Sequence, residues 1–120
     1  KGSRDDAKRN MEDTLQRFSA GQIDAVVANN DEMAIGAASA IADAGRTAEF
    51  KAVVGVDGTE PAMQDIKAGT MSATVRQDSA GQGVKAVEVV TDFLKGGNVE
   101  NRYTLPFTLI TKDNLSEFLK

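Results

Sequence analysis

Short apolar runs alternate along this chain with segments in which apolar residues recur every three or four positions. The runs lie at 23–28, 52–56 and 71–77, and a fourth follows at 103–110. Their β-branched composition is typical of buried strands, whereas the spacing between them is typical of amphipathic helices. Strands that alternate with helices form a parallel sheet with helices on both faces. The sequence therefore predicts a doubly wound α/β fold of about four strands.

The segments between these runs carry start and stop signals of helices. The first predicted helix begins at Arg4 and ends by Gly21, and no predicted strand precedes it. A second follows the polar group at 29–31 and stops before Gly45, and a third ends at Gly69. Glycine is frequent at helix ends because it adopts the left-handed conformation without a steric penalty.

A fourth predicted helix begins at Asp78 or Ser79 and ends before Gly96. Its apolar residues recur at helical spacing and form a stripe that we expect to pack on the sheet. The stripe consists of Val84, Val87, Val90, Phe93 and Leu94. A last turn of helix is expected within 113–119.

Length and composition indicate one folded domain. The chain has 120 residues, of which 41% are hydrophobic and 27% are charged, a balance typical of globular rather than disordered chains. We expect residues 1–120 to form a single domain that is truncated, because the first helix lacks a preceding strand. Residues 1–3 are interpreted as a possible remnant of cloning.

The chain contains no histidine and no cysteine. This excludes Ser-His-Asp triads, Cys-His pairs and zinc sites built on these ligands. The net charge of −4 repels phosphate backbones, so we expect no nucleic-acid partner. No apolar run approaches the roughly 18–20 residues of a membrane helix. We also expect no cofactor and no metal.

Polar residues follow three of the predicted strands. In open α/β sheets, ligands bind beyond the carboxyl ends of the strands, so we expect these residues to gather on one rim. Carboxylates and carboxamides supply the fixed acceptors and donors that suit neighbouring hydroxyl groups, which favours a polyhydroxylated ligand. The residues are Asn29, Asn30 and Asp31 after the first strand, Asp57 after the second, and Arg76, Gln77 and Asp78 after the third.

Purely structural roles are an open alternative for the same residues. Asn30 or Asp31 can cap a helix, Asp57 can start a turn with Gly58, and Gln77 can be solvated. Spacing alone does not decide between these roles and a binding role. Asp78 is most simply the cap of the fourth helix.

Two further patterns suggest other chemistry. Residues 81–86 match the dinucleotide fingerprint G-x-G-x-x-A, but its glycines fall inside the predicted helix rather than directly after a strand, which favours close packing. The carboxylates Asp31, Asp57 and Asp78 suggest a magnesium or glycosidase site, but only their position at strand ends supports it. We expect neither site.

Three motifs occur in order at these strand ends. They are ANNDEMAIGA at 28–37, VGVDGT at 54–59 and ATVRQ at 73–77, the last followed by GQG at 81–83. Together they resemble the second lobe of periplasmic sugar-binding proteins of the ribose, galactose and inositol type. The resemblance extends from about Arg4 to the end of the chain.

The resemblance implies a flavodoxin-like partial lobe that binds a monosaccharide or cyclic polyol without catalysis. It assigns hydrogen bonds with sugar hydroxyls to Asn30, Asp57 and Gln77, with Arg76 and Asn29 as secondary residues of the rim. It also implies a periplasmic location, a missing N-terminal lobe, and a membrane permease of an ABC transporter as partner of the parent protein. Within the family, the residues Gln77 and Asp78 followed by GQG at 81–83 favour inositol-like or ribose-like ligands.

The chain departs from that family at one position, because Gly2 stands about where the family carries an aromatic residue that stacks on the ligand. The effector-binding domain of lactose-repressor-type regulators is the alternative, although these more usually have Gly-Phe-Asp-Asp where this chain has residues 55–58. A third and weaker hypothesis is a sugar-modifying enzyme whose acid and base are Asp31 and Asp57. Because strands are missing, an exposed sheet edge is also expected to favour a homodimer.

Overall fold

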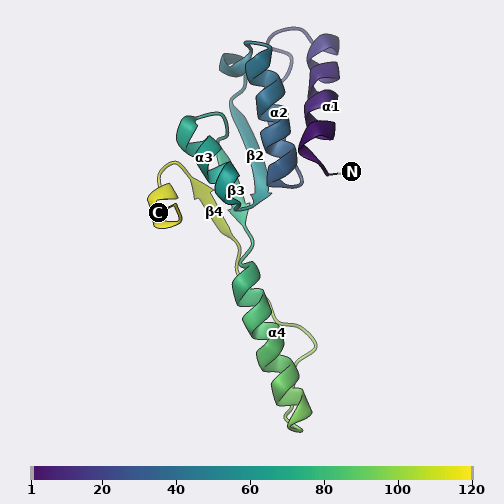
Figure 1. Ribbon diagram of the computed structural model, residues 1–120, viewed down its shortest axis with the longest axis vertical. Coiled ribbons are helices and arrows are strands. Elements are labelled where there is room, and N and C mark those ends of the chain that lie inside the picture. The colour runs from purple at the N-terminus through teal and green to yellow at the C-terminus, as the bar shows by residue number, and fades with distance from the viewer. Residues whose placement is uncertain (1, 120) are drawn as a thin grey trace. The chain divides into compact units, whose positions relative to one another are not determined.

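The computed structural model describes residues 2–119. Figure 1 follows the chain through its elements. In order, they are α1 (Arg4–Arg17), β1 (Ala25–Val27), α2 (Asp31–Asp43), β2 (Ala52–Asp57), α3 (Glu60–Ala68), β3 (Ala73–Arg76), α4 (Ser79–Leu94) and β4 (Thr108–Thr111), with 3₁₀ turns at Thr47–Glu49 and Leu115–Glu117.

The chain divides into two compact units. The first comprises residues 1–76 and 109–120 and holds α1, α2 and α3 with the strands β1 to β3. The second comprises residues 77–108 and holds α4 and the segment after it. Asn30 and Asp57 thus belong to the first unit and Gln77 to the second.

The strands form one sheet in the order β1-β2-β3-β4. β1 pairs with β2 and β2 with β3, both parallel, and Asp57 lies opposite Arg76 at the ends of β2 and β3. The predicted α/β class with a four-stranded sheet is confirmed. The last strand is shorter than predicted, because Pro106 has no N–H to donate to a ladder and regular pairing starts only at Thr108.

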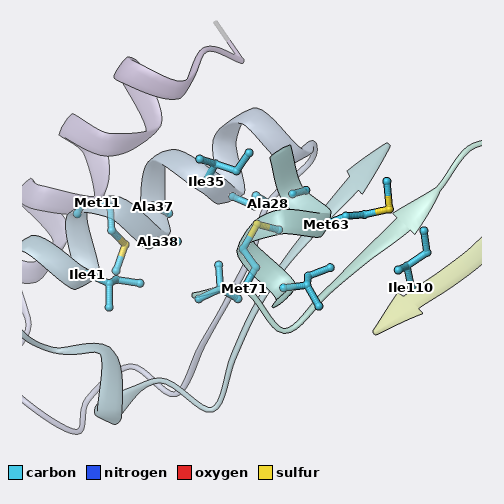
Figure 2. Close-up of a cluster of buried hydrophobic side chains, with 14 of the residues drawn as sticks. Met11, Ala28, Ile35, Ala37, Ala38, Ile41, Met63, Met71 and Ile110 are labelled. Atoms are coloured by element: carbon cyan, nitrogen blue, oxygen red, sulfur yellow. The ribbon is translucent and has the colours of Figure 1, made fainter. Parts of the chain in front are cut away.

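α2 is the centre of the core. It packs against α1, β1, β2 and α3. Its small side chains allow these close contacts, and Figure 2 shows Ala37, Ala38 and Ile41 among the buried apolar side chains, with Met11 and Met71 in the same cluster. Four alanines of α2 are buried in these contacts, namely Ala34, Ala37, Ala38 and Ala40.

The apolar stripe of α4 is not buried as predicted. Its five side chains are 56–78% exposed. Within the second unit, the segment after α4 reaches only part of this stripe: Tyr103 and Leu105 line a groove with Val90, and Lys85 Nζ lies 5.5 Å from the centre of the Tyr103 ring. Periodicity identified the apolar residues, but most of their surface stays exposed. No helix among residues 2–119 has the length and apolarity to span a membrane.

Candidate functional site

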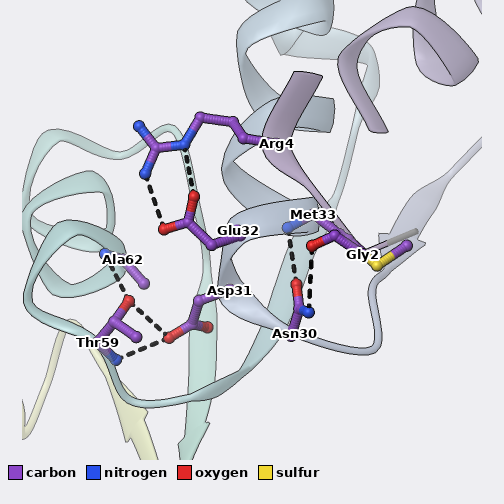
Figure 3. A network of polar contacts seen from close by, with 8 residues as sticks. All are labelled: Gly2, Arg4, Asn30, Asp31, Glu32, Met33, Thr59 and Ala62. Atoms are coloured by element: carbon purple, nitrogen blue, oxygen red, sulfur yellow. Dashed lines mark hydrogen bonds and ion pairs between the residues drawn. The ribbon is translucent and has the colours of Figure 1, made fainter. Parts of the chain in front are cut away.

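Asn30 follows β1 and caps α2. Its backbone is extended, and its Oδ1 accepts a hydrogen bond from the Met33 N–H at 2.9 Å, while Nδ2 donates to the Gly2 carbonyl at 3.5 Å (Figure 3). The capping role considered for this residue is therefore confirmed. The same two bonds hold the carboxamide in one orientation at the carboxyl end of β1. Neighbouring Asn29 is exposed.

Asp57 ends β2 with an unusual backbone. Its φ is +123°, and it is the only residue other than glycine with positive φ in the described part of the chain. Residues other than glycine rarely adopt a positive φ, and such backbone strain is concentrated at functional sites. Gly58 continues the turn at φ +73°, where a Cβ would lie 2.7 Å from Cβ of Arg76. The exposed Asp57 side chain is thus presented on a turn packed against the end of β3.

Asp31 has a role that the sequence did not reveal. It is the first residue of α2 and is fully buried, so the capping role proposed for it belongs to Asn30 instead. Its carboxylate accepts hydrogen bonds from the Thr59 N–H at 2.7 Å, the Thr59 hydroxyl at 3.0 Å and the Thr74 hydroxyl at 2.6 Å. The one available signal was the position of Thr74 between the apolar residues Ala73 and Val75 of β3.

An ion pair joins the starts of α1 and α2. Arg4 donates two hydrogen bonds to Glu32, each 2.9 Å long, as Figure 3 shows. These bonds raise the pKa of the Arg4 guanidinium above its usual value. Both side chains are nearly half exposed, so the pair orients the two helices more than it stabilises them.

The residues at the end of β3 fall into both units. Arg76 belongs to the first, where its guanidinium lies 5.6 Å from the centre of the Phe118 ring. Gln77 opens the second, and its carbonyl accepts a hydrogen bond from the Ser79 N–H at 2.8 Å. Asp78 caps α4 through the Gly81 N–H at 3.1 Å, as predicted.

The first unit by itself brings two of the predicted binding residues to one rim. Asn30 follows β1 and Asp57 is the last residue of the parallel neighbour β2, and each is adjacent in the chain to a residue of the Asp31 hydrogen-bond network. Among residues 2–119, no group of three or more carboxylates is placed to hold a metal ion. The rim offers directed hydrogen-bond donors and acceptors, which is the chemistry of hydroxyl recognition.

Comparisons with known proteins all point to one family. Residues 1–98 match the family described as periplasmic binding protein domain. A protein of Rhizobium meliloti named for rhizopine binding is 45% identical over 102 residues, which cover 84% of this chain and 33% of that protein. A ribose import binding protein of Salmonella typhimurium is 40% identical over 90 residues, covering 75% of this chain and 30% of that protein.

A solved structure extends the similarity to nearly the whole chain. It is an ABC transporter solute-binding protein from Bacillus halodurans with bound myo-inositol, with a TM-score of 0.89 and 39% identity. The match covers 98% of this chain and 40% of that one. The chain thus spans about a third of the length of the relatives that it matches in sequence.

Proposed function

The chain belongs to the periplasmic binding protein family, and we propose that it forms part of the cleft in which an ABC-transporter receptor binds a sugar or cyclic polyol without catalysis. The observation that carries this proposal is that Asn30 and Asp57 lie at the carboxyl ends of two adjacent parallel strands, with Asp57 in a strained conformation. Strain at an exposed acidic side chain costs folding free energy, so a binding role accounts for its presence.

The proposed contacts follow from the chemistry of hydroxyl groups, each of which donates and accepts hydrogen bonds. The Asp57 carboxylate accepts from ligand hydroxyls, and the carboxamides of Asn30 and Gln77 offer both donors and acceptors. Arg76 and Asn29 are secondary contacts at the same strand ends. Gly2 lies beside the side-chain amide of Asn30, and a Cβ at Gly2 would lie 3.5 Å from Asn30 Nδ2. Because this residue is glycine, it places no aromatic ring at this position.

The relatives support an inositol-like or ribose-like ligand within this ligand class. The Bacillus halodurans structure, 39% identical to this chain, contains myo-inositol, and a ribose import protein is 40% identical over a shorter stretch. We propose an inositol-like or ribose-like ligand, a periplasmic location, a second lobe that completes the cleft, and a membrane permease as partner. These relatives support a solute receptor rather than the lactose-repressor-type alternative.

Ligand titration tests the proposed function. Amide NMR spectra of the chain are recorded while ribose, galactose or myo-inositol is added to the order of tens of millimolar, a range that captures the weak affinity of part of a cleft. We expect myo-inositol or ribose to shift the resonances of Asn30, Asp57 and Gln77. If none of the three compounds shifts these resonances, the proposed site is wrong for this chain.

We also propose that a second copy of the chain pairs with the outer edge of β1. β1 lies at the end of the sheet, and its Val27 is 81% exposed and lines a largely apolar groove together with residues of α1 and α2. Unpaired strand edges recruit other strands. Light scattering is expected to give the mass of a dimer.

Two valine substitutions test whether the dimer forms through the edge of β1 or through another exposed apolar surface. Val27→Lys places a charge on the edge and is expected to give a monomer, whereas Val87→Lys, on α4 at a similarly exposed valine, leaves the dimer intact. A monomeric wild-type chain at every concentration contradicts the proposal, and so does an equal effect of the two substitutions.

A further inference from the structure

We propose that Asp31 is a positioning residue, whose buried carboxylate holds the Asp57–Gly58 turn and the start of α3 in the conformation that binds ligand. This inference rests on the proposed function. Asp31 is fully buried and accepts three hydrogen bonds, all from residues outside its own helix. It directly follows Asn30, so one short segment carries both a ligand-binding carboxamide and the group that orders the neighbouring turn.

One arm of the network fixes the turn after β2. Asp31 Oδ1 accepts the Thr74 hydroxyl proton at 2.6 Å, and Thr74 Oγ1 accepts a hydrogen bond from the Gly58 N–H at 3.1 Å. A hydroxyl has a single proton, so giving it to Asp31 leaves the oxygen lone pairs for Gly58. The carboxylate therefore determines the direction of this chain of bonds, which ends on the peptide that joins Asp57 to Gly58.

The other arm fixes the start of α3. Asp31 Oδ2 accepts both the backbone N–H of Thr59 at 2.7 Å and its hydroxyl at 3.0 Å. The Thr59 oxygen in turn caps α3 by accepting from the Ala62 N–H at 3.4 Å, as Figure 3 shows. The two arms thus hold the segment on both sides of Gly58.

A carboxylate suits this site better than a carboxamide, because all three partners donate to Asp31. The NH2 of an asparagine would either face the Thr59 N–H, which cannot accept, or turn the Thr74 hydroxyl proton away from the site and leave it without this acceptor. The carboxylate also has little freedom to move, because a Cβ on Gly55 of β2 would come within 2.4 Å of Asp31 Oδ1. Burying a carboxylate adds little net stability, because the loss of hydration offsets the hydrogen bonds that it gains. We expect it instead to select the one conformation in which all of its hydrogen-bond donors are in place.

The test compares Asp31→Asn with Asp43→Asn, the same chemical change at an exposed position of the same helix. Hydrogen exchange of backbone amides and NMR titration with myo-inositol and ribose are measured on each chain. Asp31→Asn is expected to speed exchange at Gly58 and Thr59 by about tenfold or more while Ile41 and Ile66 keep their protection, and to weaken ligand binding about tenfold. Asp43→Asn is expected to change neither.

A second pair of variants covers the case in which Asp31→Asn does not fold. Thr74→Val keeps the shape of the buried side chain and removes the hydroxyl, whereas Thr74→Ser restores it. Thr74→Val is expected to free the Gly58 amide and weaken binding, and Thr74→Ser to return both toward wild type. Unchanged exchange at Gly58 in both Asp31→Asn and Thr74→Val overturns the inference.

The two proposals fail in different ways. A wild-type chain that binds none of the ligands contradicts the proposed function, while the exchange rates at Gly58 and Thr59 still decide whether Asp31 orders the turn. A wild-type chain that binds, together with an Asp31→Asn chain that binds equally well, contradicts the positioning role alone.

Discussion

Replacing Gly36 with alanine is expected to lower the free energy of unfolding by about 1–3 kcal/mol, although alanine is the better helix former. Gly36 lies inside α2 where α1 crosses it. A Cβ at this position would lie 2.2 Å from the carbonyl oxygen of Arg4 and 3.1 Å from the backbone nitrogen of Lys8. Both neighbours are backbone atoms, so α1 as a whole must move away from α2.

Gly83 provides the matched control, since it also lies inside a helix but has no atom within 4 Å of its absent Cβ. Gly83→Ala is expected to be neutral or to stabilise by about 0.5–1 kcal/mol through helix propensity. Urea unfolding followed by circular dichroism measures both variants. If Gly36→Ala were as stable as Gly83→Ala, the close approach of α1 to α2 would be wrong.

Two substitutions of Asp57 are expected to lower ligand affinity equally but to differ in their effect on the stability of the fold. Asp57→Gly and Asp57→Ala both remove the carboxylate, so each should cost about 1–3 kcal/mol of ligand binding free energy by leaving hydroxyl groups unpaired. The two variants differ in the backbone, because glycine accepts φ of +123° and alanine does not. Asp57→Gly is therefore expected to be more stable than Asp57→Ala by about 1–2 kcal/mol.

Thermal unfolding and NMR titration with myo-inositol are measured on the same samples. Asp13→Ala, at an exposed position of α1, serves as the control and is expected to leave binding unchanged. Equal stability of the glycine and alanine variants would show that the turn relaxes at no cost. Unchanged affinity in both variants would remove Asp57 from the proposed site.

Local patterns in the sequence predicted much of the fold, because the interactions behind them join residues close together in the chain. Gly69 adopts the left-handed conformation at the end of α3, and Asp78 caps α4 three residues before its partner Gly81. The placement of Asn30 and Asp57 at strand ends also followed from local order, since Asn30 lies three residues after the end of β1 and Asp57 is the last residue of β2. Their binding role, like that of Gln77, stays a prediction.

The same reasoning was less successful wherever the outcome depended on a distant partner. Periodicity marked the stripe of α4 but could not say what covers it, and its side chains are more than half exposed. The run 103–110 has strand composition, but pairing requires a partner for each N–H, and only Thr108–Thr111 is a strand.

The alternation of strands and helices, the helix caps and the polar residues at strand ends could be predicted from the sequence, because these depend on side-chain spacing and on hydrogen bonds across three or four residues. By contrast, Asp31 is buried beside these strand ends through contacts that the local sequence does not contain. Its partners lie 28 and 43 residues away. A carboxylate at the start of a helix has the same local sequence whether it faces water or three buried donors, and the packing of α2 on β2 settles which it meets.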